Sequence, residues 1–179
     1  YLIDNCGFEI NSWESTHRAG MMAYLLEDGC IMRSGRTSSK IFQGGGIGGV
    51  IEKFSWSGEL LWTFTMANDS VHLHHDIEVL PNGNVLAIAW KKNSAEDAIS
   101  KGRDPNKTGL SVWSTLILEI EPSYPIGGQI VWSWDAWDHL VQDFDPSLPS
   151  YGHPRDFPGK IDVNFNAVGG TSSSARDWL

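Results

Sequence analysis

The sequence has few cysteines, no long apolar run and no cluster of basic residues. Two cysteines among 179 residues are too few for a disulfide-based scaffold. No apolar run approaches the ~20 residues of a membrane-spanning helix, so no membrane span is expected. The net charge is −9, and the longest run of basic residues is Lys91-Lys92. A nucleic-acid backbone is therefore a poor partner for this chain.

Aromatic residues and glycine-containing turns are abundant by contrast. Nine Trp, seven Phe and four Tyr, within a sequence that is 41% hydrophobic, indicate a packed core rather than disorder. The apolar residues lack a helical period and alternate in short runs on either side of turns. This pattern predicts an all-β protein.

Two turn patterns alternate along the sequence, and each predicts a β-hairpin. In the first, an aliphatic pair and an acidic residue lead through a Gly-containing turn to Trp13, Trp62 or Trp132. In the second, Asp28-Gly29 or Asn82-Gly83 stands between apolar residues. Such dipeptides favour tight hairpins because Gly and Asn tolerate a positive φ. The three Trp side chains are expected to pack within the sheets rather than stack on a ligand.

Four strands in a unit of roughly 50 residues are typical of a β-propeller blade. A single blade cannot bury both of its faces, and propellers close with ~4–8 blades. The sequence therefore predicts a partial β-propeller of about two to three four-stranded blades. Residues 1–179 would belong to one domain, with insertions at about 91–110 and 135–176, and would pack against the remaining blades of the same protein. The alternative is a self-contained β-sandwich with coincidental repeats.

Both ends of the sequence have the pattern of a chain cut from a longer one. Tyr1 stands in a strand-like run, and residues 169–174 form a Gly/Ser-rich linker. Cys6 and Cys30 fall at hairpin tips that a meander would place on the same sheet edge. A Cys6–Cys30 disulfide is therefore predicted, with two buried free thiols as the alternative.

Three of the six histidines are His72, His74 and His75, directly before a strand expected over residues 77–79. Strand alternation would place His72, His74 and Asp76 on one face and His75 on the other. Imidazoles at i and i+2 can converge on a metal, although no further ligand stands at a recognised spacing. Alternatively, one histidine forms a capping hydrogen bond at the start of the strand. At the head of an innermost propeller strand, where the channel opens, the cluster favours a functional site.

The stretch from His74 to Leu86 resembles the motif of the bacterial arylsulfotransferases, the aryl-sulfate sulfotransferase (ASST) family. Residues 49–62, 24–29 and 137–142 are similar to other parts of that family, so the likeness covers most of the chain. It implies a six-bladed propeller that is exported from the cytoplasm and is secreted or periplasmic. The active site would lie in the central channel, lined by His, Asn and Arg from several blades.

The resemblance also implies an activity, namely transfer of a sulfuryl group from a phenolic sulfate ester to an acceptor phenol. A histidine nitrogen attacks sulfur, the phenolate leaves, and the acceptor captures a sulfo-histidine intermediate. Neutral imidazole is a competent nucleophile near pH 7, and the relay divides one difficult step into two. The mechanism requires neither a metal nor a cofactor. The likeness says nothing of the oligomeric state.

Among the candidate catalytic residues, His74 and His75 match the histidine motif, whereas His139 would reach the channel from a loop or else anchor that loop. The candidate substrate-binding residues are Asp76, Asn84 and Arg36. For Asn84 the alternative is a role in holding its turn, and for Arg36 an exposed salt bridge.

The family contributes a further histidine motif from a later blade, and Asp177-Trp178-Leu179 resembles its opening. The nucleophile is therefore alternatively expected beyond Leu179. Two other functions stay open: a non-catalytic propeller that binds carbohydrate, protein or a cell surface, and a metal-dependent hydrolase that uses His72, His74 and Asp76.

Overall fold

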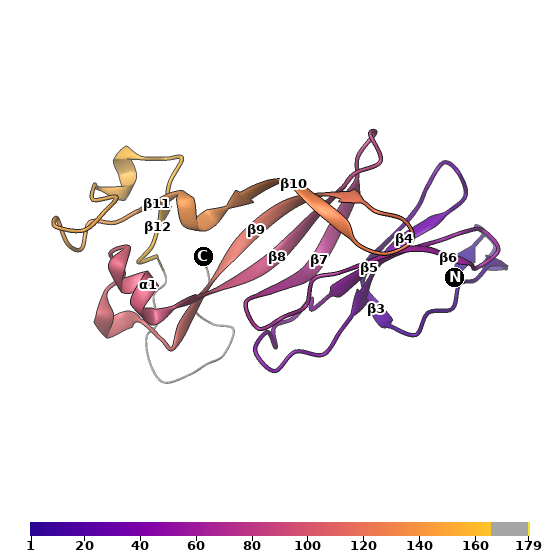
Figure 1. The fold of residues 1–179 in the computed structure, drawn as a ribbon, viewed down its shortest axis with the longest axis horizontal. Coiled ribbons are helices and arrows are strands. Elements are labelled where there is room, and N and C mark those ends of the chain that lie inside the picture. The colour runs from indigo at the N-terminus through magenta and orange to yellow at the C-terminus, as the bar shows by residue number, and fades with distance from the viewer. Residues whose placement is uncertain (166–178) are drawn as a thin grey trace.

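Two four-stranded antiparallel sheets dominate the computed structural model, which describes residues 1–165 and 179 (Figure 1). The first sheet has the order β3-β4-β5-β6, with β3 (Arg18–Leu25), β4 (Ile31–Arg36), β5 (Gly49–Phe54) and β6 (Leu60–Thr65). The second has the order β10-β9-β8-β7, with β7 (Val71–Val79), β8 (Val85–Ser94), β9 (Ser111–Pro122) and β10 (Gly128–Asp135). The all-β prediction is confirmed, and two such meanders are compatible with a partial propeller.

Smaller elements lie at both ends of the molecule. A two-stranded sheet of β1 (Leu2–Ile3) and β2 (Glu9–Asn11) precedes the first large sheet, and a parallel pair of β11 (Leu140–Val141) and β12 (Ile161–Asp162) follows the second. The short helices are α1 (Ala95–Ser100), η1 (Pro105–Lys107), η2 (Ala136–Asp138) and η3 (Pro154–Asp156). No helix of the described residues is long and apolar enough to cross a membrane.

Each predicted turn joins the strands that the sequence pattern indicates. Asp28-Gly29 connects β3 to β4 and Asn82-Gly83 connects β7 to β8, with φ of 78° at Gly29 and 87° at Gly83. Strand β8 continues to Ser94, which caps α1, so the connection between β8 and β9 spans residues 95–110.

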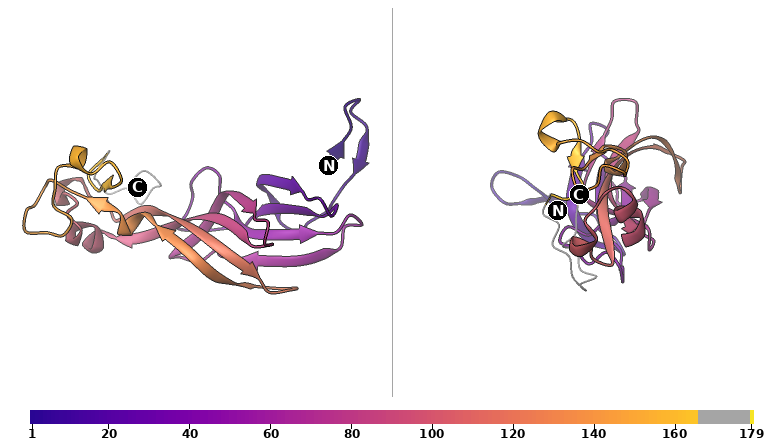
Figure 2. Two further views of the ribbon diagram at one scale, coloured as in Figure 1. Left: turned by 90° about the horizontal axis from the view of Figure 1, so that it is seen from above. Right: turned by 90° about the vertical axis from the view of Figure 1, so that its left-hand side faces the viewer.

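The main core lies between the two large sheets, which are displaced from one another along the long axis of the molecule (Figure 2). Met32, Ile51 and Trp62 from the first sheet pack with Leu73 and Ile77 from β7, and strands β8 and β9 complete the cluster. The Trp62 indole Nε1 also donates to the Gly127 carbonyl oxygen at 2.8 Å, so the turn between β9 and β10 is tied to the first sheet. The two meanders form one packed unit.

Two expectations about side chains at the hairpins are wrong. Trp132 does not pack as Trp62 does: its side chain is 49% exposed on the edge strand β10, beside a register shift between Ile130 and Trp132. Cys6 and Cys30 are both free, Cys6 exposed and Cys30 buried. The hairpin that carries Cys6 forms a separate sheet with β1 and β2, so the two tips do not share a sheet edge.

Candidate functional site

The three histidines lie inside β7 rather than before it, and a bulge interrupts the strand at His75 and Asp76. His72 is paired with Trp90 and His74 with Ile88, whereas the next pair is Ile77 with Ala87. His75 and Asp76 are therefore left without partners on β8, and His75 has φ of 49°. The predicted alternation holds for His72 and His74 but fails after them, because a bulge re-aims the side chains it carries.

The connection from β4 to β5, residues 37–48, crosses the edge of the second sheet next to the histidines. The His75 backbone N–H donates to the Gly46 carbonyl at 2.7 Å, and the Gly48 N–H donates to the Leu73 carbonyl at 3.1 Å. Ile47 forms an isolated antiparallel bridge with His74. Loop 37–48 thus occupies the free edge of β7 and fixes the backbone of the bulge.

Loop 37–48 also carries Phe42 onto the outer face of the second sheet, the face turned away from the main core. Phe42 is fully buried there against Trp90 and Trp113. The His74 ring stacks on Trp90 with a centroid separation of 4.3 Å and an interplanar angle of 19°. His72 lies 5.7 Å from Phe42 between ring centroids. An aromatic cluster therefore immobilises both imidazoles.

His74 and His75 form a hydrogen-bonded pair through their Nδ1 atoms, which are 2.8 Å apart. When both rings are neutral, one Nδ1 must carry the proton and the other must accept it. The Nε2 of His74 is buried without a partner, whereas His75 is partly exposed. The pair consequently has a buried member and a solvent-accessible member whose Nε2 is not used in the bond.

The position of His75 requires glycine at residue 46. A Cβ atom on Gly46 would overlap the imidazole of His75, and Gly46 has φ of 78°. A side chain larger than hydrogen would displace either the ring or the loop, and positive φ adds a further cost for any L-residue. Gly46 therefore belongs to the site although it brings no functional group.

Burial lowers the pKa of His74 to about 4, and the neighbouring His75 and His72 imidazoles contribute in the same direction. Burial also lowers the pKa of His72, opposed by its hydrogen bond to the Gly48 carbonyl. His72 Nε2 lies 3.3 Å from both that oxygen and Thr37 Oγ1. At neutral pH both buried imidazoles are uncharged, because burial among aromatic side chains disfavours the charged form.

The depressed pKa of His74 predicts a specific loss of stability in acid. The folded state keeps this imidazole neutral down to about pH 4, whereas the unfolded chain protonates it near the ordinary value of 6.5. As pH falls from 6.5 to 4, the unfolded state binds a proton that the folded state does not. The free energy of unfolding therefore decreases by about 2–3 kcal/mol. Urea unfolding at pH 7 and pH 4 measures the change. His74→Asn is expected to lose correspondingly less stability over that range, and equal losses in both proteins would contradict a buried neutral imidazole.

The other sequence-predicted site residues lie apart from the histidine pair or have local roles. Asp76 Oδ1 accepts from the Tyr24 hydroxyl at 2.8 Å and from the Ile77 N–H at 2.7 Å, which links β3 to β7. This contact raises the pKa of Tyr24, chiefly through the hydrogen bond. Asn84 lies at the tip of the β7–β8 hairpin, where its side chain donates to Glu119 Oε1 at 2.6 Å.

His139 and Arg36 are the remaining two candidates. His139 follows η2 and stacks on Trp134 of the edge strand β10, with centroids 4.9 Å apart and an interplanar angle of 13°. Among the described residues, no hydrogen bond or ring contact joins His139 to His74 or His75. Arg36 ends β4 and is exposed.

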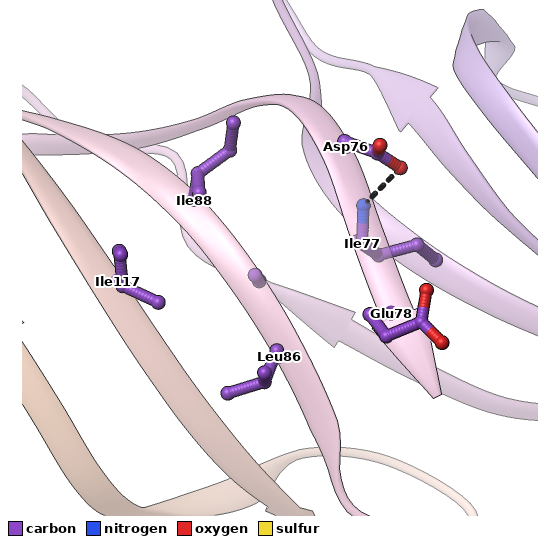
Figure 3. A pocket seen from close by; sticks show the side chains of 7 residues that line it. Asp76, Ile77, Glu78, Leu86, Ile88 and Ile117 are labelled. Atoms are coloured by element: carbon purple, nitrogen blue, oxygen red, sulfur yellow. Dashed lines mark hydrogen bonds between the residues drawn. The ribbon is translucent and has the colours of Figure 1, made fainter. Parts of the chain in front are cut away.

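A shallow apolar pocket of about 300 Å³ continues the outer face of the second sheet beyond His74 (Figure 3). Leu86, Ile88 and Ile117 project into it from β8 and β9, and Asp76 and Glu78 of β7 border it. Phe42 covers the half of this face that holds His72, whereas the half with the pocket is uncovered. The outer face therefore has apolar surface in both halves, covered in one and open in the other.

A sequence model of the family described as Arylsulfotransferase (ASST) matches residues 17–179. The chain belongs to the arylsulfotransferase (ASST) family. The resemblance noted from the histidine motif is thereby confirmed. A search of curated proteins finds no match, and neither does a search of solved structures.

The matched region of this arylsulfotransferase-family chain includes both large sheets, loop 37–48 and all the candidate residues named above. Asp177 and Trp178 of the second expected motif lie outside the described residues, but the Leu179 N–H donates to the Trp113 carbonyl at 2.8 Å. No group of three or more His, Cys, Asp or Glu within the described part of the chain could hold a metal ion. The hydrolase alternative with His72, His74 and Asp76 therefore has no metal site among those residues.

Sequence reasoning missed Phe42, Trp90 and Gly46, which shape the site. Trp90 lies opposite His72 when β7 and β8 are paired around the Asn82-Gly83 turn, so the hairpin register could have indicated its contact with the histidines. Phe42 and Gly46 lie in a connection without periodicity, and nothing local indicates which surface that connection covers.

Proposed function

We propose that this protein transfers a sulfuryl group from a phenolic sulfate ester to an acceptor phenol, with His75 as the nucleophile. Membership of the arylsulfotransferase family supports a sulfotransferase-type activity. The observation that carries the choice of His75 is its Nδ1–Nδ1 hydrogen bond to the buried His74. That bond holds the partly exposed His75 ring in a fixed orientation through Nδ1 and does not use its Nε2, the atom that would attack sulfur.

In the first step, the lone pair of His75 Nε2 forms an N–S bond while the S–O bond to the phenol breaks. The electron pair of that bond leaves with the phenolate oxygen. In the second step, the deprotonated acceptor oxygen attacks sulfur, and the N–S electron pair returns to His75. The ring must therefore carry its proton on Nδ1, the atom that faces His74, when it acts as a nucleophile.

His74 is a positioning residue in this mechanism. The His75 Nδ1–H donates to His74 Nδ1, which is available as an acceptor because burial lowers the pKa of His74 to about 4. When His75 carries the sulfuryl group, its ring gains positive charge, and this hydrogen bond becomes charge-assisted and stronger. The pair thus stabilises the intermediate more than the free enzyme, as catalysis requires.

We also propose that the two large sheets are blades of a larger propeller, in which residues 1–179 form part of a single domain. The support is the outer face of the second sheet, where Leu86, Ile88 and Ile117 line an open apolar pocket. A sheet that presents apolar surface on both faces needs a neighbour on each side. The remaining blades of the same protein would fill that role, and the family likeness favours six blades and a secreted or periplasmic protein.

The full-length protein should transfer sulfuryl from a chromogenic aryl sulfate to phenol, and a chelator should not reduce the rate. The measurement follows release of the coloured phenol together with formation of phenyl sulfate, so that transfer is separated from hydrolysis. Chelator-sensitive hydrolysis would favour the metal-dependent alternative. A full-length protein that folds normally but shows no turnover would instead favour the alternative of a non-catalytic binding propeller.

A further inference from the structure

The outer face of the first sheet carries a cluster of charged groups that sulfuryl transfer by His75 does not use. Glu52 of β5 is the cross-strand partner of Arg33 on β4. Alternate residues of a strand share a face, so both lie on the face opposite to that of the core residues Met32 and Ile51. Glu52 is only 2% exposed, and a buried carboxylate is tolerated only when it is paired and hydrogen-bonded.

Segment 12–17, which leads from β2 to β3, supplies further partners of Glu52. The Ser15 hydroxyl donates to the carboxylate at 2.8 Å, as the Arg33 guanidinium does at 3.0 Å. His17 Nδ1 lies 2.9 Å from Glu52 Oε1. Because an ionised carboxylate can only accept, His17 carries a proton on Nδ1. A neutral His17 ring then has its lone pair on Nε2, which makes no hydrogen bond within the described part of the chain.

The approach of His17 to the sheet depends on glycine at residue 35 of β4. A Cβ atom on Gly35 would lie 3.0 Å from the Cβ atom of His17 and 2.7 Å from the Val50 side chain. A neighbour would have to move to relieve contacts this short, so a side chain at residue 35 would push His17 away from Glu52. Gly35 therefore permits the contact between the imidazole and the carboxylate.

An open cavity of about 560 Å³ lies beside His17, lined by segment 12–17 and by strands β3, β4 and β5. Small-molecule sites commonly have volumes of about 300–1,000 Å³ and are lined mainly by apolar side chains with a few polar groups. Alanine at residues 19 and 23 of β3 leaves space that longer side chains would fill. The apolar lining residues are Trp13, Ala19, Ala23, Ile31 and Phe54.

The polar groups at this cavity favour a neutral ligand with one hydrogen-bond donor. Arg33 and Glu52 balance each other in charge, and the second terminal nitrogen of Arg33 donates to the His17 carbonyl at 3.3 Å. The Ser15 hydroxyl also accepts from the His17 N–H at 3.0 Å. The exposed Glu14 adds a negative charge to the lining, which disfavours an anion. His17 Nε2 is the unused acceptor in this set.

We propose that the cavity beside His17 binds a neutral alcohol with a compact aromatic or alicyclic body. The hydroxyl of the ligand donates to His17 Nε2, and its body packs against Trp13 and the two alanines of β3. Glu52 holds the proton on Nδ1 and thereby keeps the lone pair on Nε2. This binding site belongs to the first sheet and does not depend on the function proposed for His75.

The test measures binding of naphthylmethanol to the full-length protein by equilibrium dialysis. Its methyl ether has the same aromatic body but no donor. His17→Asn keeps an amide N–H that can reach Glu52 from the place of Nδ1, but it has no acceptor at the place of Nε2. Ala23→Leu fills the cavity from β3. His153→Asn replaces an exposed histidine elsewhere in the chain and is the matched control.

The wild-type protein is expected to bind naphthylmethanol about tenfold more tightly than the methyl ether, which is the effect of one well-placed hydrogen bond. In His17→Asn, Kd for the alcohol should rise about tenfold while Kd for the ether stays within about twofold. Ala23→Leu should abolish binding of both compounds, and His153→Asn should bind both as the wild-type protein does. Nitrogen-15 NMR of the free protein should show the His17 proton on Nδ1.

The absence of saturable naphthylmethanol binding, as when another part of the full-length chain fills the cavity, would overturn the proposal. Equal affinities of the wild-type protein for alcohol and ether would do the same. If His75→Asn removed alcohol binding and His17→Asn did not, the ligand would bind at the histidine pair of β7 instead. Urea unfolding checks that His17→Asn and Ala23→Leu keep the wild-type fold, and the ether measures the cavity independently of the hydrogen bond.

Discussion

Replacing His75 by alanine is expected to lower kcat for sulfuryl transfer by about 10⁴-fold or more, as loss of a covalent nucleophile does in other enzymes. The expected reason is chemical, because no other accessible imidazole shares the hydrogen bond that orients this ring. Steady-state transfer from an aryl sulfate to phenol measures the loss. After rapid quenching, mass spectrometry of wild-type protein should find the sulfuryl group on the peptide that contains residues 71–79.

A second variant separates chemistry from folding. His75 has φ of 49°, a conformation that Asn tolerates better than alanine, so His75→Asn should fold normally and be equally inactive. His74→Asn should still accept a sulfuryl group on His75 while kcat falls by about 10²-fold, which corresponds to the loss of a hydrogen bond of about 2–3 kcal/mol to a charged intermediate. Wild-type kcat in His75→Asn, or a sulfuryl group found on His74, would show that the assignment within the pair is wrong.

The hairpins could be predicted from the sequence because their causes are local. Asp28-Gly29 and Asn82-Gly83 favour positive φ at the turn, and alternating apolar residues on either side determine which face is buried. The histidine motif was recognisable for the same reason, since it lies within one strand and its hairpin. Membership of the family could likewise be inferred from short ordered motifs.

The geometry of the site could not be predicted, because distant segments determine it. Strand alternation at His75 and Asp76 fails through a bulge whose backbone is fixed by Gly46, in a loop that belongs to the other sheet. The same loop brings Phe42 to Trp90 across the edge of β7.

Trp62 and Trp132 stand at equivalent positions of the repeat, so they provide a matched test of the packing between sheets. Trp62 is fully buried, near Phe64 and Tyr124, whereas Trp132 is half exposed on an edge strand. Trp62→Ala is expected to cost about 4 kcal/mol of folding free energy, since large-to-small changes of buried aromatic residues cost about 3–5 kcal/mol. Trp132→Ala should cost less than about 1 kcal/mol. Urea unfolding of each variant measures both values.

Trp62→Phe then divides the larger cost between its two sources. Phenylalanine retains most of the apolar contact but cannot donate to the Gly127 carbonyl, which accepts from the indole Nε1 at 2.8 Å. The loss of that bond should cost about 1–2 kcal/mol, because the carbonyl of the β9–β10 turn would be left without its partner. If Trp62→Ala and Trp132→Ala had equal effects, the core between the two sheets would not stabilise the molecule. The two meanders would then fold as independent sheets rather than as one packed unit.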